Sequence, residues 1–468
     1  MKNHKSLLFI IISSPFILWT IIQILPTFDD WTYFTNPYYD FGNSFWNMLI
    51  PRASYWRPFD CFFGYILSFN DKLFPTLNHI AVYAGHIANT LMLWIISNKL
   101  GLSSQSKEVT TIFFFMSPAV LGTVLGIDSL NQVYSHLWGM IAIYVYLSGG
   151  KARYLWLICA LIATFCKENG MVYFIIPQMI AYTFGKTTMK RSIYDTLFAL
   201  VLIIVYFVAR IALSTDTAEI NNEYYDNPIA RTIKNIVKFV ITTFVISDYS
   251  LLLYKPIRNI PLAIMLALFI LPFYIYIILK SVSLAKTRKL WLLAFCVITA
   301  ASPHLVTLFT VMHAYAAFGI ICIILGLMYE EAAKHNSKTA KTLLIAFLAA
   351  SIVIDWHHIE LSRKSGEIGK RMALSVVQRI TPNDSVSVLY IDRGEEKYSS
   401  FCVIPYDAFG WGAAIRLYGN NGKPRYIDNE TFMSGDIEDI NKYADNIVKQ
   451  GFKQVLLVKG DTIDIIRQ

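Results

Sequence analysis

Residues 6–31 read SLLFIIISSPFILWTIIQILPTFDDW, and this stretch decides the fold of the chain. Its apolar run extends from Ser6 to Leu25 and has about the length, roughly 20 residues, with which an apolar helix crosses a bilayer. Pro26 ends the helix because proline cannot continue the hydrogen-bond pattern. Two adjacent carboxylates, Asp29 and Asp30, follow directly. The stretch therefore predicts a membrane-spanning helix that delivers an acidic pair to one surface of the membrane.

Lys2 and Lys5 precede the apolar stretch, a charge pattern that a secretory signal peptide also has. The stretch is longer than the apolar region of a signal peptide, and no small-residue cleavage site follows before Pro26. We therefore expect a retained first helix. Because basic flanking residues stay on the cytoplasmic side, the N-terminus is expected in the cytoplasm.

The composition is that of a protein in contact with lipid. Hydrophobic residues make up 55% of the 468 and charged residues 16%, whereas soluble domains have about 45–50% and about 25%. The net charge of +9 comes from basic residues spread over short connections, which argues against a nucleic-acid-binding face. The six cysteines form neither a CxxC motif nor a spaced ligand set, so we expect no disulfide framework and no zinc site.

Apolar runs recur up to residue 355 and predict about eleven transmembrane helices. Those after the first lie near 74–97, 109–126, 131–148, 154–166, 170–184, 192–213, 260–280, 290–308, 311–329 and 342–355. Every second connection is basic and holds Lys99 and Lys107, Lys151 and Arg153, Lys186 to Arg191, Lys280 to Lys289, or Lys334 to Lys341. An N-terminus in the cytoplasm places all of these on the cytoplasmic side, as the positive-inside rule requires.

The stretch 232–254 is predicted to be an amphipathic helix on the outer surface of the membrane. It mixes Lys234, Lys238 and Asp248 with apolar residues. Counting it as a span would put the basic connection 280–289 on the wrong side of the membrane. The remaining number of helices is odd, which leaves the C-terminal part outside.

The C-terminal part is predicted to be a small α/β domain. Ser385 to Ile391 and Gln454 to Val458 have the pattern of strands, and Ile437 to Gln450 has that of an amphipathic helix. The chain is thus expected to be an α-helical polytopic membrane protein with an extracytoplasmic α/β domain. The predicted domains are 1–355, with its first outer loop at 26–73, and 356–468.

The first outer loop holds the residues of greatest chemical interest. Asp29 and Asp30 stand beside aromatic residues, where they are either the N-cap of a short interfacial helix or a catalytic pair. Further along, Arg52 and Arg57 are suited to an anionic headgroup. The alternative is a set of arginines that reach out to ordinary lipid phosphates.

Polar groups also occur in later helices. His79, His86 and Asn89 share one face of the second helix, and hydrogen bonding between helices is their simpler interpretation. Lys167 and Glu168 join two apolar runs at the outer end. They form either a self-neutralising turn or a lysine that meets a phosphate and a glutamate that orients it. Weaker candidates at outer helix ends are His304, His313, Asp128, Arg210 and Asp355.

The order of these motifs resembles the GT-C glycosyltransferases, in the branch of the protein O-mannosyltransferases and their bacterial relatives that use polyprenyl-phosphate sugars. In that branch the first outer loop carries an acidic pair, an Asn and a Tyr-Arg-Pro-like element. The similar positions here are Asp29, Asp30, Asn36 and Trp56-Arg57-Pro58, then His79, His86 and Asn89, and then Lys167-Glu168. The resemblance covers about the first 175 residues. It departs at Val82, where an Asn is common, and at His313-Ala314-Tyr315, where relatives have Glu-Arg-Tyr.

This resemblance implies transfer of a sugar from a polyprenyl-phosphate donor to an acceptor hydroxyl on the extracytoplasmic side, with inversion at the sugar. One of Asp29 and Asp30 would be the general base, and the other would position the acceptor. The groups for the donor phosphate would be Arg57, Lys167, Arg52 and, in place of the missing arginine, His313 or Arg210. The substrate-positioning residues would be Asn36, His79, His86 and Glu168. With a single phosphate to neutralise, no metal and no further cofactor are expected.

The expected partners are the lipid-linked donor, a protein, lipid or glycan acceptor, and membrane lipids, without nucleic acid. A surface-polysaccharide polymerase or ligase is the nearer alternative, although the acidic pair beside the first helix favours the monosaccharide transferase. A secondary transporter is less favoured because no internal repeat is visible and the charges gather at one surface. The Lys-, Asn- and Ile-rich composition suits a bacterial inner membrane. The sugar and the acceptor stay open.

Overall fold

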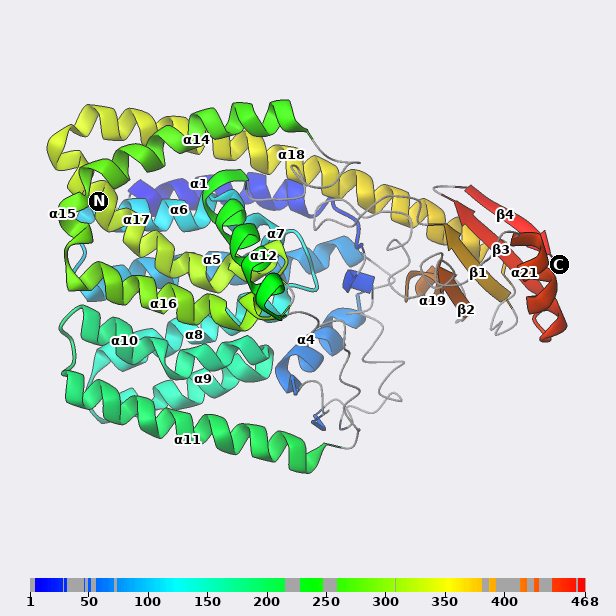
Figure 1. The fold of residues 1–468 in the computed structure, drawn as a ribbon, viewed down its shortest axis with the longest axis horizontal. Coiled ribbons are helices and arrows are strands. Elements are labelled where there is room, and N and C mark those ends of the chain that lie inside the picture. Colours follow the sequence, from blue (N-terminus) through cyan, green and yellow to red (C-terminus); the bar gives the residue numbers. More distant parts are fainter. Residues whose placement is uncertain are drawn as a thin grey trace.

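A computed structural model describes most of the chain. The described residues are 5–27, 29–31, 46, 49–51, 56–70, 74–214, 228–246, 259–307, 309–380, 387–392, 413–418, 425–428, 440–459 and 462–467. They form a helical bundle, from which one long helix leads to a small α/β domain (Figure 1). Two residues of the predicted site, Asn36 and Arg52, lie outside the described residues.

The bundle is built from helices. In chain order these are α1 (Lys5–Ile21), α4 (Pro58–Ser68), η1 (Pro75–Asn78), α5 (His79–Leu100), α6 (Ser104–Met116), η2 (Pro118–Val120), α7 (Leu121–Val124), α8 (Leu130–Ser148), η3 (Lys151–Tyr154), α9 (Leu155–Cys166), η4 (Glu168–Phe174), α10 (Ile176–Thr183), α11 (Met189–Leu213), α12 (Pro228–Ile241), η6 (Thr242–Ile246), α14 (Ile260–Lys280), α15 (Val282–Ala285), α16 (Arg288–Leu305), η8 (Val311–Ala314), α17 (Tyr315–His335) and α18 (Ser337–Val377).

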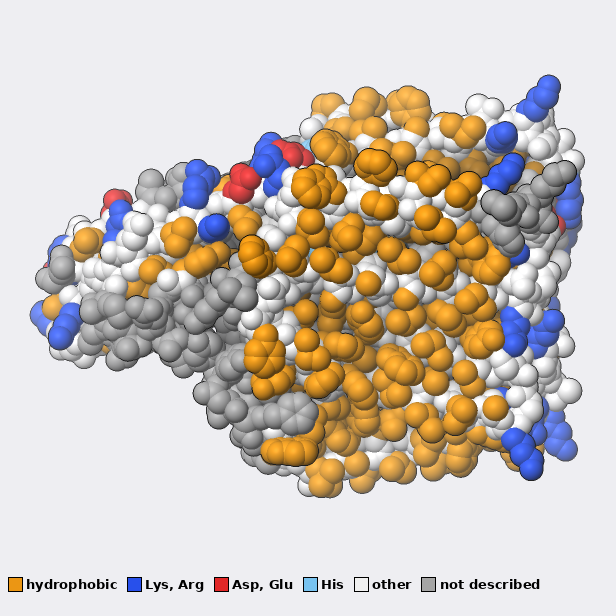
Figure 2. Space-filling view, turned by 180° about the vertical axis from the view of Figure 1, so that it is seen from behind, with side chains coloured by type: hydrophobic (Ala, Val, Ile, Leu, Met, Phe, Trp, Pro, Cys, Tyr) orange, Lys and Arg blue, Asp and Glu red, His pale blue; other side chains and the backbone are white. Residues whose placement is uncertain are grey.

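The outer surface of the bundle is apolar. Large hydrophobic side chains cover it in a broad belt (Figure 2), and on α11 Ile204 is 62% and Ile211 72% exposed. A soluble protein rarely exposes a continuous apolar surface of this kind, so the belt faces lipid. The chain is therefore an α-helical membrane protein.

Five helical stretches of the described part are long and apolar enough to cross a membrane. They are Pro75–Leu100, Met189–Leu213, Ile260–Lys280, Val311–His335 and Ser337–Val377, and Lys5–Ile21 is a shorter apolar helix. The larger number of about eleven spans stays a prediction. Several predicted runs, such as 154–166, coincide with helices of the bundle that are shorter or less apolar.

Two predicted helices are broken in the structure. The run 109–126 was expected to be one helix, but α6 ends at Met116 because Ser117 is extended and Pro118 begins a new turn. The Ser117 hydroxyl accepts from the Ala119 amide and so caps that turn. The run 170–184 is likewise divided, since η4 ends at Phe174 before α10 begins.

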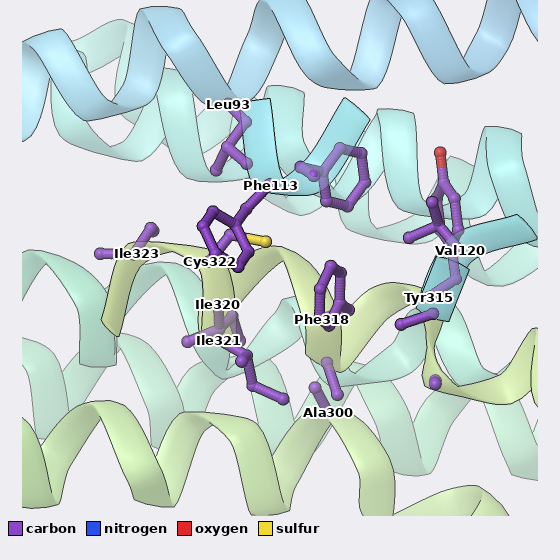
Figure 3. Packing of buried hydrophobic residues seen from close by; sticks show 14 of the residues in the cluster. Leu93, Phe113, Val120, Ala300, Tyr315, Phe318, Ile320, Ile321, Cys322 and Ile323 are labelled. Carbon is purple, nitrogen blue, oxygen red and sulfur yellow. The ribbon is translucent and has the colours of Figure 1, made fainter. Parts of the chain in front are cut away.

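The core of the bundle lies around α17, which is enclosed along most of its length. Figure 3 shows part of this core, in which Leu93 of α5, Phe113 of α6 and Phe318 of α17 point into the interior between the helices. All three side chains are completely buried. Helices α6 and α17 approach closely at Gly326, because a Cβ atom there would lie 2.2 Å from the Thr110 hydroxyl. Only glycine permits this contact.

Helix α18 joins the bundle to the C-terminal domain. It is 41 residues long and runs without a break through the predicted domain boundary at 355. The domain holds α19 (Ala413–Tyr418), α21 (Ile440–Lys449) and four strands in the order β2-β1-β3-β4. The strands are β1 (Ser387–Asp392), β2 (Arg425–Asp428), β3 (Gln454–Lys459) and β4 (Thr462–Arg467). β1 is parallel to β2 and β3, and β4 is antiparallel to β3.

The two ends of the bundle differ in charge. The N-terminus lies at the end opposite to the C-terminal domain (Figure 1), and Lys and Arg side chains gather at that same N-terminal end of the apolar belt (Figure 2). The acidic turn at 29–31, α4 and α12 lie toward the other end, on the side of the C-terminal domain. We call this second end the domain side.

The predicted amphipathic stretch 232–254 is described only up to residue 246. Its α-helical part, α12, has 14 residues, fewer than the roughly 20 that span a bilayer. The Asn235 amide donates to the Leu305 and Thr307 carbonyls, and Ile233 and Val237 on another side are exposed. One face of the helix is thus attached to the bundle, and another is apolar and exposed.

Candidate functional site

The acidic pair lies on a short helical turn, residues 29–31, that follows the end of α1 on the domain side. Asp30 is 3% exposed. One of its carboxylate oxygens accepts from the backbone amides of Ile127 (2.7 Å) and Asp128 (2.9 Å), and the other accepts from the Thr27 amide (3.0 Å). Asp30 therefore fastens the first loop to the connection between α7 and α8.

Asp29 differs from its neighbour in exposure and surroundings. Its side chain is half-buried. It directly precedes Asp30, whose oxygens face the bundle, and Trp31, whose ring is completely buried. Among the two carboxylates of the pair, Asp29 is the one that solvent reaches.

A second carboxylate, Asp128, lies against Asp30. Burial raises the pKa of both carboxyl groups above their usual range, and for Asp30 the field of Asp128 adds to this effect. Lys167 acts in the opposite direction on Asp128. Asp128, one of the weaker candidates at outer helix ends, thus belongs to the same group of residues as Asp30.

Lys167 is the cation at the centre of this group. It lies in the connection between α9 and η4, within electrostatic range of Asp128, Asp60 and Glu168. Burial, and next the charge of Arg57, lower its pKa to about 8, although the three carboxylates oppose the shift. Lys167 therefore loses its proton more readily than an exposed lysine does. The three carboxylates around it come from three separate segments of the chain.

Arg57 and Glu168 form an ion pair at 2.7 Å between Nε and Oε2. The other oxygen of Glu168 accepts from the Trp56 amide at 3.2 Å, and the Trp56 ring stacks on Tyr206 of α11, 5.6 Å between centroids. The Tyr206 hydroxyl also interacts with Arg210, one turn further along α11. The structure therefore brings together Arg57 and Lys167-Glu168, which are more than a hundred residues apart.

Two histidines extend the site toward α16 and α17. The imidazoles of His304 and His313 are stacked 3.7 Å apart between centroids. His304 Nε2 lies 2.9 Å from the Asn169 amide, which also donates to Gln132. His313 Nδ1 accepts from the Thr310 backbone amide at 3.0 Å and so caps its own helical turn. Because Nδ1 is an acceptor there, His313 is held in the neutral form with its proton on Nε2.

The polar face of α5 lies elsewhere. His86 Nδ1 is 2.9 Å from the Tyr315 hydroxyl, and the Asn89 amide donates to the Val133 carbonyl at 2.9 Å. Both side chains are buried and tie α5 to α8 and α17. His79 is completely buried at the start of α5, beside the backbone of Ile24. His86 and Asn89 therefore make the hydrogen bonds between helices that the simpler interpretation of these residues predicts.

Several residues of the site were not singled out by sequence. Asp60 on α4 accepts from the Asn131 amide at 3.3 Å, and Gln132 and Asn169 meet between α8 and η4. Each is a single polar residue in a separate segment, so no local spacing marks it. Within the described residues no three His, Cys, Asp or Glu side chains are grouped in a way that could hold a metal ion.

Comparison with known proteins gives only distant likeness. No family model matches the chain, and no curated protein is similar to it. The archaeal oligosaccharyltransferase AglB from Archaeoglobus fulgidus, in complex with an inhibitory peptide and a dolichol-phosphate, is 11% identical over 97% of this chain and 69% of that chain, with a TM-score of 0.47. The Archaeoglobus fulgidus oligosaccharyltransferase tethered to an acceptor peptide is 10% identical over 92% and 65%, with a TM-score of 0.49. Its complex with Zn and sulfate gives 10%, 93% and 64%, with a TM-score of 0.48.

The chain spans about two thirds of the length of these oligosaccharyltransferases, or slightly less. At this identity and TM-score the likeness carries no argument about activity. The functional argument therefore rests on the residues of the site.

Proposed function

We propose that the protein is a membrane glycosyltransferase that moves a sugar from a polyprenyl-phosphate donor to an acceptor hydroxyl. The observation that carries the proposal is that the acidic turn, residues 29–31, is linked through Asp128 to the cations Lys167 and Arg57. Such a site offers a base for a hydroxyl and cations for a phosphate at the level of lipid headgroups. Transfer from a lipid-linked donor requires the base, the cations and the position at the level of the headgroups together.

Asp29 is the proposed general base. Its carboxylate accepts the proton of the acceptor hydroxyl while the hydroxyl oxygen attacks the anomeric carbon of the sugar. Asp30 is the proposed positioning residue, since three backbone amides already occupy its oxygens. This arrangement assigns the two roles of the acidic pair to one residue each.

Arg57 and Lys167 are the proposed groups for the donor phosphate. As the bond between the anomeric carbon and the phosphate oxygen breaks, the electron pair leaves with the phosphate, whose growing charge these cations stabilise. Glu168 keeps the Arg57 guanidinium in one orientation. His313, with its proton on Nε2, supplies a neutral N–H donor, and His304 stacks on its ring. Direct attack by the acceptor inverts the sugar, and the proposed reaction uses no metal ion.

The site is proposed to face away from the cytoplasm. Basic residues gather at the opposite end of the bundle (Figure 2), and the positive-inside rule places such an end in the cytoplasm. The N-terminus would then be cytoplasmic, and the C-terminal domain would be extracytoplasmic, in a bacterial inner membrane. The acceptor is proposed to be a hydroxyl of a protein, lipid or glycan on that side.

The test is turnover in lipid nanodiscs with a panel of polyprenyl-phosphate sugars, read out as release of polyprenyl phosphate. Wild type is compared with Asp29→Asn, and Lys338→Gln, an exposed substitution on α18 at the N-terminal end of the bundle, is the control. We expect one donor to be consumed by wild type and control, and Asp29→Asn to lower kcat by about 10²–10⁴-fold. Turnover of no donor with any acceptor, or full activity of Asp29→Asn, would overturn the proposal.

A further inference from the structure

Trp31, the residue after the acidic pair, is buried in the C-terminal domain. Its side chain has no exposed surface and packs in an apolar cluster made by three parts of the chain. These parts are the end of α18, α19 and the strands β3 and β4, with Met372, Ala373, Val376, Ile380, Ala414, Ile415, Leu456, Val458 and Ile463. The Trp31 ring meets Tyr418 edge to face, 5.5 Å between centroids. A residue of the first outer loop is therefore part of the hydrophobic core of a domain almost 400 residues away.

The other side of the same turn is fixed to the bundle. Asp30 accepts from the amides of Ile127 and Asp128, so that consecutive residues, Asp30 and Trp31, are held by different bodies. Asp29 stands directly before them on the same helical turn. A movement of the C-terminal domain relative to the bundle would therefore shift the backbone that carries Asp29.

Helix α18 strengthens this connection. A Cβ atom at Gly366 would lie 2.7 Å from the Leu25 carbonyl oxygen, so the helix passes directly against the chain that leads into the acidic turn. Small buried residues Ser362, Ser365 and Gly369 lie on the same stretch of α18. Helix α18 thus contacts Leu25, which precedes the acidic turn, through Gly366, and it packs against Trp31 through its last residues.

We propose that Trp31 is a positioning residue, through which the C-terminal domain holds Asp29 in place for the transfer reaction. This inference rests on the proposed function. The C-terminal domain is then a part of the framework of the active site, and docking of its core on Trp31 sets the position of the base. A general base needs its position kept to within a fraction of an ångström, because a displacement of about 1 Å costs about a hundredfold in rate.

The experiment uses two conservative substitutions in the full-length protein in nanodiscs. Trp31→Phe keeps an aromatic ring in the cluster but shortens it, and Trp156→Phe makes the same change at another buried tryptophan, which packs on Tyr146 in the bundle. Tyr418→Ala removes the ring that faces Trp31 without changing the first loop. We expect Trp31→Phe and Tyr418→Ala to lower kcat about tenfold or more with an unchanged donor KM, and Trp156→Phe to leave kcat unchanged.

Three outcomes overturn the inference: unchanged kcat in Trp31→Phe and Tyr418→Ala, an equal loss in Trp156→Phe, or a rise in donor KM in place of the fall in kcat. Hydrogen exchange gives a readout that does not depend on activity. Tyr418→Ala is expected to speed amide exchange in peptides that span residues 24–31, and Trp156→Phe is not. If wild type turns over no donor while this exchange effect is present, the proposed function fails and the coupling stands; unchanged exchange contradicts the coupling itself.

Discussion

At the scale of single residues, the two acids of the pair differ in what holds them. Asp30 connects segments that lie 97 and 98 residues apart in sequence, because its oxygens accept from Ile127 and Asp128. Asp29 is half-buried on the same turn. Sequence reasoning identified the pair and left open whether it is an N-cap or a catalytic pair, and which of the two acids would be the base. The structure shows the partners of Asp30. They could not be predicted from the first loop, because they lie in a distant part of the sequence.

The three amides bound by Asp30 predict a difference in stability between the two acids. Asp30→Ala leaves buried N–H groups without their acceptor, at roughly 1–3 kcal/mol for each group that water does not reach. Asp29→Ala is expected to cost less than about 1 kcal/mol, as for most partly exposed positions. Thermal unfolding in detergent, followed by near-UV circular dichroism, measures both. Equal melting temperatures of the two variants would contradict the role of Asp30 as the link between first loop and bundle.

The shifted groups of the site predict how stability depends on pH. The carboxyl pair Asp30 and Asp128 has a raised pKa, so the folded state retains protons that the unfolded state loses above its usual value of 3.8. Their contribution is present below that value and is lost as the pH rises through the folded pKa values. Lys167 has a pKa lowered from 10.5 to about 8, and its contribution is present above 10.5 and is lost as the pH falls through about 8.

We therefore expect the melting temperature to fall from about pH 4 towards neutrality and to rise again above about pH 8. Lys167→Met is expected to flatten the alkaline side, because the group that titrates there is absent. Asp30→Asn is expected to reduce the fall in melting temperature on the acidic side of the profile, and the fall that remains is due to Asp128. Melting curves at constant ionic strength between pH 4 and 10.5 give the profile. A profile that is flat in wild type on both sides would contradict burial as the cause of these shifts.

Arg57 gives a prediction about the donor phosphate. Arg57→Lys keeps the charge but loses the planar fork that holds Glu168, and is expected to lower kcat about tenfold. Arg57→Gln removes the charge as well and is expected to lower kcat by about 10²–10³-fold, as for the loss of one donor to a developing anion. Steady-state release of polyprenyl phosphate measures both, with Arg371→Gln on exposed α18 surface as the control. A smaller effect of Arg57→Gln than of Arg57→Lys would exclude this role.

At the scale of helices and strands, the sequence predicted those elements whose apolar pattern is local. The expected run 131–148 agrees with α8, Leu130–Ser148, and the expected helix 192–213 lies within α11. The last span was expected near 342–355, with the domain boundary directly after it. The helix continues to Val377, and Gly366 in this extension lies against Leu25 at the end of the first apolar run. A contact with so distant a segment leaves no local pattern in the sequence.

Gly366 gives the prediction for this element. Gly366→Ala introduces a Cβ atom 2.7 Å from the Leu25 carbonyl oxygen and 2.9 Å from the Leu25 Cβ. Because the neighbour is backbone, it cannot turn away, and the variant is expected to lose about 1–3 kcal/mol of stability. Arg371→Ala on the exposed side of the same helix is the control and is expected to lose less than about 0.5 kcal/mol. Equal melting temperatures of these two variants would show that α18 and the first loop can separate without cost.

At the scale of the whole molecule, sequence reasoning placed the acidic turn and the C-terminal domain on one side of the membrane, but as independent parts. Composition and the spacing of basic connections predict the sidedness, and both can be read from a single sequence. The insertion of Trp31 among residues of α18, α19 and β3 depends on the folded arrangement of the whole chain. A buried tryptophan at a loop has no local signature, because interfacial aromatic residues follow many transmembrane helices.

The sidedness itself leads to a prediction for labelling. Lys449 on α21 and Lys186 between α10 and α11 are both exposed, and they lie at opposite ends of the molecule (Figure 1). In a background whose six native cysteines are replaced by serine or alanine, Lys449→Cys is expected to react with a membrane-impermeant maleimide added to spheroplasts. Lys186→Cys is expected to react only after the membrane is permeabilised, because the positive-inside rule predicts that its basic connection faces the cytoplasm. Lys338→Cys, at the start of α18, is the matched second position for the inner side. Labelling of Lys186→Cys and Lys338→Cys in sealed spheroplasts, with Lys449→Cys protected, would invert the topology. It would place the acidic turn and its cations on the cytoplasmic side, where an acceptor outside the cell has no access to Asp29.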